Sequence, residues 1–183
     1  MKKIFTLVCV LLLGMGFAQA QVHQGETAVG VNLLYGSEIE SMGVGARFQY
    51  GVLDKLRGEV GFNYFFEKHQ ATWWDVNLNA HYLFSFWNDQ LVVYPVAGLI
   101  YSMKTKRNEE KRETKEETVD GQVIQKEIIT PAYKDEENHV GLNLGAGIEY
   151  EINEHFGVNF EYRHSIMRKN DQGVFAAGIN YKF

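Results

Sequence analysis

The sequence predicts an all-β fold, an eight-stranded antiparallel up-and-down transmembrane β-barrel, on three observations. In the final stretch every second residue is apolar or aromatic from Phe175 to Phe183, and the residues between them are smaller or more polar, as in a half-exposed strand. Seven further segments repeat this alternation over about ten residues, the length that a tilted strand needs to cross a bilayer. The composition, 14% aromatic residues and 18 glycines against only 2 prolines, suits many extended segments.

A closed barrel explains how so many strands with one apolar face can coexist in one chain. An open sheet edge beside such a face promotes aggregation, whereas a closed barrel has no edge and can turn its apolar face to lipid. A helical membrane protein is excluded, because outside the N-terminal segment the chain contains no apolar run of about 18 residues.

Residues 1–20 are predicted to be a cleavable signal peptide, which leaves 21–183 as a single barrel domain. Two lysines precede an apolar run at 4–13, and Ala18 and Ala20 supply the small side chains of a cleavage site. The one cysteine of the chain lies inside this leader, so no disulfide or thiol chemistry is expected after cleavage. The net charge of −5 gives no indication of a nucleic-acid partner.

Each of the first four strands has one apolar face and one face rich in glycine, asparagine and charged residues. In the fourth, for example, Trp74, Val76 and Leu78 face one way, and Asp75 and Asn77 face the other. We expect these four strands at 26–35, 42–51, 57–66 and 72–85.

The fifth strand, at 91–103, is apolar on both faces, so its register is left open. Pro95 within it predicts a local bulge or a missing ladder hydrogen bond. The last three strands return to clean alternation and are expected at 139–151, 156–166 and 172–183.

The connections between strands are expected to alternate in character along the chain. Around Asp54, Asn88 and Asn153 they are tight, whereas the others are more polar and include one very long segment. Short turns face the periplasm in barrels of this kind and longer loops face outward. Both chain ends are therefore expected on the periplasmic side.

Tyrosine and tryptophan gather near the predicted strand ends, which suggests aromatic girdles at two membrane interfaces. A soluble lipocalin-like barrel, the alternative, would turn its apolar face inward around a ligand and would need no girdle at both ends. The outer set is Tyr35, Tyr64, Trp73, Trp74 and Tyr101, and the inner set is Tyr50, Tyr82, Trp87, Tyr150 and Tyr181.

The segment 104–138 interrupts the strand pattern with closely spaced charges of both signs. Its simplest interpretation is a solvated extracellular loop. Asp120-Gly121 is a hairpin signal, and it predicts that the fifth and sixth strands continue beyond the membrane as a ribbon. The edge of such a ribbon could pair with another protein by strand addition. The first half of the segment also suits a helix, because Glu and Lys recur there with i,i+4 spacing.

A set of charged residues is expected to point into the lumen. The interior of an eight-stranded barrel is narrow, so charges inside it must be paired. We interpret the set as a salt-bridged network that holds the barrel shut, rather than as a proton path or a binding site. Small residues in the outer half (Gly30, Gly43, Gly45 and Gly141) leave open whether a cavity lies there. The charged set is Arg47, Arg57, Glu59, Asp75, Glu149, Glu161 and Arg163.

The sequence predicts no enzyme activity, no metal site and no cofactor. Small outer-membrane barrels that hydrolyse lipid carry a His and a Ser on one lipid-facing wall, but here His164 and Ser165 are consecutive and must point to opposite faces. They therefore cannot form a nucleophile–base pair. The six histidines show no metal-ligand spacing.

The leader, the alternation and the terminal aromatic strand together resemble the small eight-stranded outer-membrane barrels of the OmpA/OmpX type, within the porin-like outer-membrane β-barrel family. The resemblance implies a chain that is secreted through the inner membrane of a Gram-negative-type bacterium and inserted into its outer membrane. It also implies recognition of Ile179, Tyr181 and Phe183 by the barrel assembly machinery.

The expected function is a structural or surface-interaction role through the extracellular loops, with a possible protein partner at 104–138. The alternative is passage of small hydrophobic or small polar molecules across the outer membrane, as in OmpW-like or porin-like barrels. The expected partners are outer-membrane lipid and the assembly machinery, and the protein is expected to be a monomer.

Overall fold

The computed structural model describes residues 24–183 except 69, 88–89, 109–110, 120–121, 131–132 and 169–170. The predicted signal peptide with Ala18 and Ala20, and the hairpin signal at Asp120-Gly121, lie outside the described residues. Among the residues described, no helix is long and apolar enough to cross a membrane.

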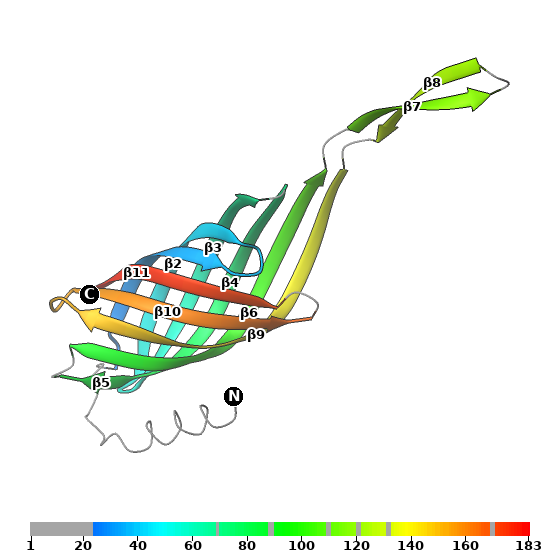
Figure 1. The fold of residues 1–183 in the computed structure, drawn as a ribbon. Helices are drawn as coiled ribbons and strands as arrows, with labels where there is room; N and C mark the ends of the chain where they lie inside the picture. The colour runs from blue at the N-terminus through cyan, green and yellow to red at the C-terminus, as the bar shows by residue number, and fades with distance from the viewer. Residues whose placement is uncertain are drawn as a thin grey trace, which may run out of the picture.

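The described chain is built from antiparallel strands in two sheets (Figure 1). Nine strands form the barrel sheet and two form a separate two-stranded sheet. The strands are β1 (Thr27–Gly36), β2 (Ser41–Leu53), β3 (Leu56–Lys68), β4 (Ala71–Tyr82), β5 (Phe84–Phe86), β6 (Leu91–Asn108), β7 (Lys111–Val119), β8 (Gln122–Thr130), β9 (Tyr133–Glu151), β10 (Phe156–Met167) and β11 (Gln172–Lys182).

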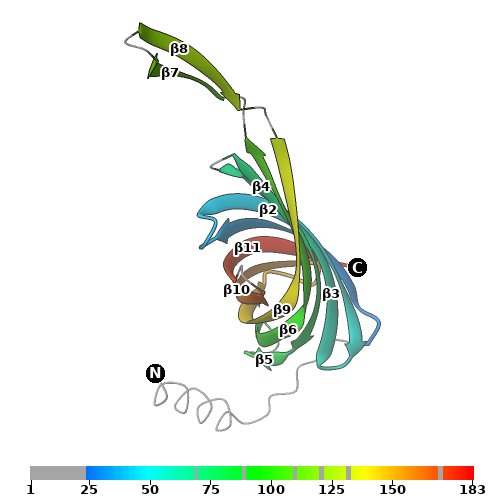
Figure 2. The ribbon, with the colours of Figure 1, turned by 90° about the vertical axis from the view of Figure 1, so that its right-hand side faces the viewer.

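The larger sheet closes on itself, and the strands wrap around a common axis (Figure 2). The last strand returns to the first, with Val29 opposite Tyr181 and Tyr35 opposite Phe175. At the other side of the sheet β4 pairs with β6. β4 and the short β5 pair with β6 one after the other in the same register, so together they count as one strand of the wall. The barrel is therefore eight-stranded, closed and antiparallel, which confirms the predicted fold.

Side chains alternate between the outer wall and the lumen, as the sequence predicts. On β1, Val31 and Leu33 are 64% and 63% exposed, whereas their neighbours Asn32 and Leu34 are buried. The same inside–outside alternation continues around the barrel, so the outer wall is largely Val, Leu, Ile, Phe and Tyr. An apolar outer band of this kind matches a surface made to contact lipid.

The predicted strand at 72–85 is divided in two, and Pro95 is the cause. The pairing of β4 with β6 stops at His81 opposite Val96 and resumes, in the same register, at Phe84 opposite Val93. Pro95 faces the gap at Tyr82 and has no N–H to donate, so one ladder bond is missing. The pairing with β3 continues across this break, since the backbone N–H of Leu83 donates to the carbonyl oxygen of Lys55 at 2.8 Å, in the register that sets Leu56 opposite Tyr82.

The two ends of the barrel differ less in loop length than the sequence suggests. At the end where β1 begins and β11 ends, called the turn end, the connections are 54–55, 87–90 and 152–155. At the opposite end, called the loop end, 37–40, 69–70 and 168–171 are equally short. The expectation of longer loops at that end therefore holds only for the segment between β6 and β9.

The long charged segment forms strands rather than a loop or a helix. β6 and β9 stay paired without a register shift out to Asn108 opposite Tyr133, and β7 and β8 lie beyond their ends (Figure 1). Val119 lies opposite Gln122, the register that a two-residue hairpin connection requires. The segment 104–138, with β7, β8 and the extensions of β6 and β9, is therefore a protruding ribbon, as one of the three sequence interpretations predicts.

Replacing Leu78 on the outer wall by arginine tests whether this wall lies in hydrocarbon. Leu78 is 57% exposed and lies on β4 midway between Trp74 and Tyr82. We expect Leu78→Arg to lower the free energy of unfolding in lipid vesicles by about 2–4 kcal/mol, because a cation at the bilayer centre loses its hydration.

The matched control is Leu53→Arg at the end of β2, where the side chain is equally exposed, at 55%, but lies next to a turn. Urea titrations in vesicles should give a loss of less than about 1 kcal/mol there. Equal losses at both positions would contradict a lipid-facing outer wall.

Candidate functional site

The centre of the lumen holds an ion-pair network contributed by three strands. Arg47 on β2 contacts two carboxylates through Nη1, Glu59 Oε2 at 3.2 Å and Glu161 Oε2 at 3.5 Å. Arg163 on β10 contacts the other oxygen of Glu161, with Nε at 3.0 Å from Oε1. All four side chains are buried, and the two positive charges balance the two negative ones.

A second group of buried charges lies nearer the turn end. Arg57 Nη1 is 2.8 Å from Glu149 Oε2, and its guanidinium lies 5.0 Å from the ring centre of Tyr94. Tyr94 also contacts the central ion pairs, because its hydroxyl donates to Glu161 Oε2 at 3.1 Å. His81 stacks on the same ring with centroids 4.8 Å apart. Tyr94 therefore joins the two groups into one lumen network.

Asp75 is buried but stands apart from the arginines. It accepts hydrogen bonds from two amide side chains, Asn63 at 2.8 Å and Asn77 at 2.5 Å. Among the described ion pairs none includes Asp75. Of the seven charged residues that the sequence places in the lumen, the structure brings six into ion pairs and leaves Asp75 in an asparagine cluster.

Several members of the lumen network were not predicted as site residues. Tyr94 was missed because the fifth predicted strand is apolar on both faces, which hides its register. Asn32 and Asn159 accept from Arg47 Nη2, and Gln49 donates to Glu59 Oε2 at 2.9 Å. The sequence does indicate these three amide side chains, because Asn32, Gln49 and Asn159 each lie on the polar face of their strand.

The buried carboxylates and His81 do not form a convincing metal site, although their potential ligand atoms lie close together. One oxygen or nitrogen from each of Glu59, His81 and Glu161 lies within 4.8 Å of the others. Both carboxylates are already neutralised by Arg47 and Arg163, so a divalent cation would bring two uncompensated charges into a buried site. The unpartnered His81 Nε2 and Glu149 Oε1 are better suited to ordered water.

The loop-end half of the lumen is filled by apolar side chains, here called the loop-end plug. A ligand or ion entering from this end would meet it before reaching the charged network. The plug consists of Leu34, Phe65, Trp73, Ile100, Met167, Val174 and Ala176, with Ile39 packed against it.

Trp73 was predicted to lie in the outer aromatic girdle, and the structure corrects this assignment. It is only 5% exposed and belongs to the plug. Trp73 and Trp74 are consecutive on one strand, so only one of them can point outward. Trp74 takes that position and packs near Phe62 and Tyr101, with ring centres 6.1 and 6.0 Å away.

The glycines of the loop-end half do not leave a hollow lumen. A Cβ atom at Gly43 would lie 3.0 Å from the ring of Phe65, and one at Gly141 would lie 2.5 Å from Met167 Cγ. At Gly45 the nearest atom is Asn63 Oδ1, at 2.4 Å. The backbone of the next strand is nearer still at two of these positions, with Tyr64 O 2.5 Å from a Cβ at Gly43 and Ile166 O 2.3 Å from one at Gly141. Adjacent strands and side chains therefore fill the space beside these glycines.

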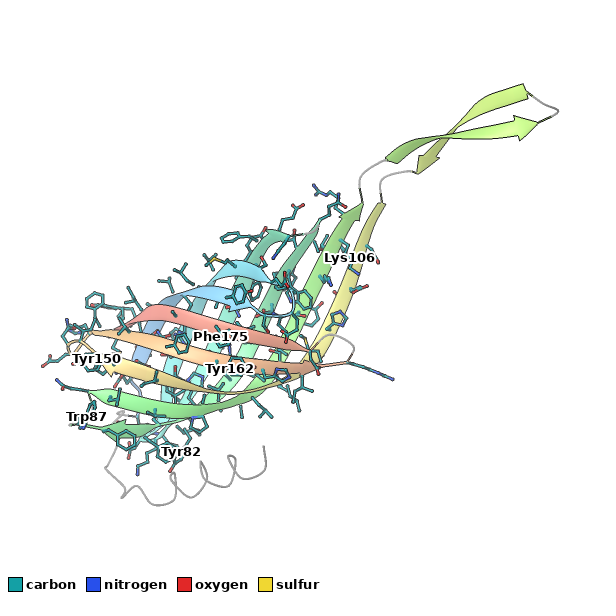
Figure 3. The ribbon with its side chains drawn as sticks, in the orientation of Figure 1. Tyr82, Trp87, Lys106, Tyr150, Tyr162 and Phe175 are labelled. Atoms are coloured by element: carbon teal, nitrogen blue, oxygen red, sulfur yellow. The ribbon has the colours of Figure 1, made fainter. Side chains whose placement is uncertain are left out.

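The other predicted girdle residues lie on the outside of the barrel. Tyr35, Tyr64 and Tyr101 are exposed towards the loop end. Figure 3 shows Tyr82, Trp87 and Tyr150 around the turn end. The remaining exposed members are Tyr50 and Tyr181, and the proposed assembly residues Ile179 and Phe183 share the outer wall. Contact of these rings with a membrane interface, and recognition of the last strand, stay predictions.

The loop 37–40 is tied across the loop-end rim by Glu38. Its carboxylate accepts from the Ser37 hydroxyl and from the backbone N–H of Gly173. Partial burial alone would raise the pKa of the Glu38 carboxyl, but these two hydrogen bonds outweigh it and hold that pKa below its ordinary value. Glu38 therefore stays ionised and fixes the loop to β11.

His164 and Ser165 lie on opposite faces of β10. Ser165 points into the lumen, where its hydroxyl donates to Asn143 Oδ1 at 2.7 Å, whereas His164 has the outward parity and is partly exposed. This geometry agrees with the alternation that the sequence predicts for two consecutive strand residues, and it keeps the two side chains from acting on one substrate.

Comparison with known proteins points to one family. The family model described as "Outer membrane protein beta-barrel domain" matches residues 5–183. Outer membrane protein X of Escherichia coli K12 is 26% identical over 147 residues, which covers 77% of this chain and 74% of that protein.

Solved structures agree in fold. The N-terminal β-barrel domain of Pseudomonas aeruginosa OprF superposes with a TM-score of 0.64 at 15% identity, covering 87% of this chain and 98% of that one. Ail, the attachment invasion locus protein of Yersinia pestis, superposes with a TM-score of 0.56 at 15% identity, covering 88% and 100%.

Removing one partner of the Arg57–Glu149 pair tests whether the lumen network stabilises the barrel. We expect Arg57→Met to lower the free energy of unfolding by about 3–5 kcal/mol, because it leaves the Glu149 carboxylate buried without its cation. The double variant Arg57→Met/Glu149→Leu should recover most of that loss in the same urea titration in vesicles. A single variant as stable as the unmodified protein would show that the pair carries no structural weight.

Proposed function

We propose that this chain, which belongs to the outer membrane protein β-barrel domain family, captures an extended segment of another protein. The segment would bind at the cell surface, on the open edge of the ribbon. The observation that carries the proposal is the mismatch in length between β9 and β10. β9 begins at Tyr133, but its pairing with β10 begins only at Gly141, opposite Met167. Residues 133–140 therefore present a strand edge that no described strand covers.

The hydrogen-bonding direction along this edge follows from the barrel. The N–H of Glu151 donates to Gln90, before β6, whereas that of Ile152 donates to Phe156, on the β10 side. Since the β6–β9 register is unbroken, even-numbered residues of β9 direct their backbone groups away from β6. The N–H and C=O groups of Lys134, Glu136, Asn138 and Val140 therefore face the open edge.

The surroundings of the edge favour a guest strand with basic side chains. Asp135, Glu136 and Glu137 are consecutive on β9. Lys106 pairs with the last of them, with Nζ 3.5 Å from Glu137 Oε1. At the foot of the edge, Asn138, Val140 and Arg168 border a hollow of about 460 Å³, where the end of a guest strand would meet the barrel. Main-chain pairing would supply affinity and the acidic run would supply preference.

The alternative function, passage of small hydrophobic or polar molecules, would need an open path through the barrel. The loop-end plug and the lumen network fill successive levels of the interior. An eight-stranded barrel is in any case only wide enough for side chains. The interaction role requires no pore.

The remaining parts of the proposal concern orientation and assembly. The ribbon faces the cell exterior and the turn end faces the periplasm, because the one long connection, between β6 and β9, leaves the barrel at the loop end, and long loops face outward in barrels of this kind. Lipid contacts the outer wall, the barrel assembly machinery takes up the terminal strand, and the barrel works as a monomer.

A backbone change at Asn138 tests the edge directly. An eight-residue peptide of alternating lysine and valine should protect the Glu136 and Asn138 amides from hydrogen exchange when added to the protein in lipid nanodiscs. Asn138→Pro should weaken its binding at least about tenfold, because it removes one edge donor and obstructs the approaching strand. The pairing with β6 should survive, since residue 138 does not donate to β6.

Asn138→Ala is the matched control, because it removes the same side chain and keeps the N–H. It should bind within about twofold of the unmodified protein. Equal binding by the proline variant, or equal affinity for a glutamate–valine peptide of the same length, would contradict strand addition at this edge.

Conductance across planar bilayers separates the interaction role from passage. We expect the refolded protein to be silent, and a variant lacking 104–138 to be silent as well, because the plug lies inside the barrel wall and not in the ribbon. Stable single-channel steps from either protein would overturn the proposed ranking of the two functions.

A further inference from the structure

A small pocket opens at the loop-end mouth of the barrel, above the loop-end plug. It lies between the loop 37–40, the end of β3 and the first residues of β4, and β6 closes it on one side. Its volume is about 170 Å³. Ile39, Phe65 and Trp73 form its apolar side, and Ser41, Lys68 and Lys104 are among its polar lining residues. We call it the mouth pocket.

The floor of the mouth pocket is closed. Phe65 and Trp73 belong to the plug, together with Leu34, Ile100 and Met167, all at most 5% exposed. A molecule in the pocket would therefore rest on packed side chains with no route into the lumen. The site is suited to binding and not to passage.

Lys104 gives the pocket an available positive charge. It lies directly opposite Trp73 in the β4–β6 ladder, and its Nζ is 5.3 Å from the centre of the Trp73 ring. Its neighbours Lys68 and Lys106 are paired with Glu40 and Glu137, at 3.2 and 3.5 Å. Glu137 lies opposite Lys104 in the β6–β9 ladder, but its carboxylate pairs with Lys106, and Lys104 forms no ion pair with a described residue.

The acidic group in the lining does not cancel this charge. The Glu38 carboxylate is occupied by Ser37 and Gly173, and its hydrogen bonds direct it towards β11. Ser41 is likewise engaged, with its hydroxyl donating to the carbonyl oxygen of Phe66 at 2.7 Å. The ammonium of Lys104 is thus the polar group left to meet a ligand.

We propose that the mouth pocket binds a small single-ring aromatic carboxylate. Its ring would lie against Phe65 and Trp73, and its carboxylate would accept a charge-assisted hydrogen bond from Lys104 Nζ. The size limits the ligand to one ring, because an apolar cavity on the order of 150 Å³ holds benzene. This binding activity is separate from strand capture, since it uses the inner face of the mouth and not the open edge of β9.

Benzoate is the probe that tests the site. In the refolded protein in zwitterionic nanodiscs, 15N-labelled tryptophan gives one indole signal each for Trp73, Trp74 and Trp87. Benzoate should shift the Trp73 signal with saturation at a Kd of about 1 mM, a usual affinity for a ligand of this size. The other two indole signals should stay in place, because Trp74 and Trp87 point outward.

Two lysine variants assign the binding to the pocket. Lys104→Gln should weaken benzoate binding about tenfold or more, the usual effect of losing a hydrogen bond to a charged group. Lys106→Gln combined with Glu137→Gln, which removes the neighbouring ion pair without freeing the Glu137 carboxylate opposite Lys104, should leave the affinity within about twofold. Benzyl alcohol, which has the ring without the charge, should bind the unmodified protein as weakly as benzoate binds the Lys104 variant.

Three results would overturn the proposal. They are a Trp73 signal that does not move up to about 10 mM benzoate, equal affinities of the two lysine variants, and linear shifts of all three indoles, which indicate partition into lipid. Heat-modifiable gel migration of each variant shows that it has folded, so a loss of binding can be read as a loss of the site.

Discussion

The structure depends on one constraint, that a backbone crossing hydrocarbon must satisfy all its hydrogen bonds within the protein. The pairing of β1 with β11 and of β4 with β6 meets this constraint, because no described strand of the barrel is left with an open edge along its membrane-crossing length. Once the sheet is closed, strict alternation divides every strand into an outer and an inner set. The apolar outer wall and the separate inner set of side chains both follow from this alternation.

The interior follows from the narrowness of an eight-stranded barrel. Every inward side chain must fit and every inward charge must find a partner. The lumen separates into an apolar plug near the loop end and a charged network towards the turn end. Tyr94 links the two ion-pair groups because its ring contacts Arg57 and its hydroxyl reaches Glu161. Because the interior is filled, the polar groups open to solvent at the loop end are those of the ribbon, where β9 extends beyond its pairing with β10, and of the mouth, where Lys104 lies opposite Trp73.

The sequence predicts the barrel and most of its inward charges because both depend only on parity along a strand. Arg47, Glu59 and Glu161 could be placed without knowing their neighbours. Their partners could not, since contacts across the lumen depend on the shear of the closed sheet. Tyr94 was hidden by a strand apolar on both faces. Trp73 lies inside although it stands near a strand end, because Trp74, its neighbour on the strand, takes the outward position. The break at Leu83 required the register that sets Pro95 against Tyr82.

The most direct measurement is paramagnetic broadening of methyl signals in nanodiscs that contain lipid with a nitroxide on its acyl chain. We expect Val31, Leu78 and Leu142, which are 64%, 57% and 54% exposed, to lose their signals to the labelled lipid. The buried methyls of Leu34, Ile100 and Val174 should keep theirs. If a water-soluble gadolinium chelate broadened the signals of Val31, Leu78 and Leu142 and the labelled lipid did not, the outer wall would face water and the barrel would not lie in a membrane.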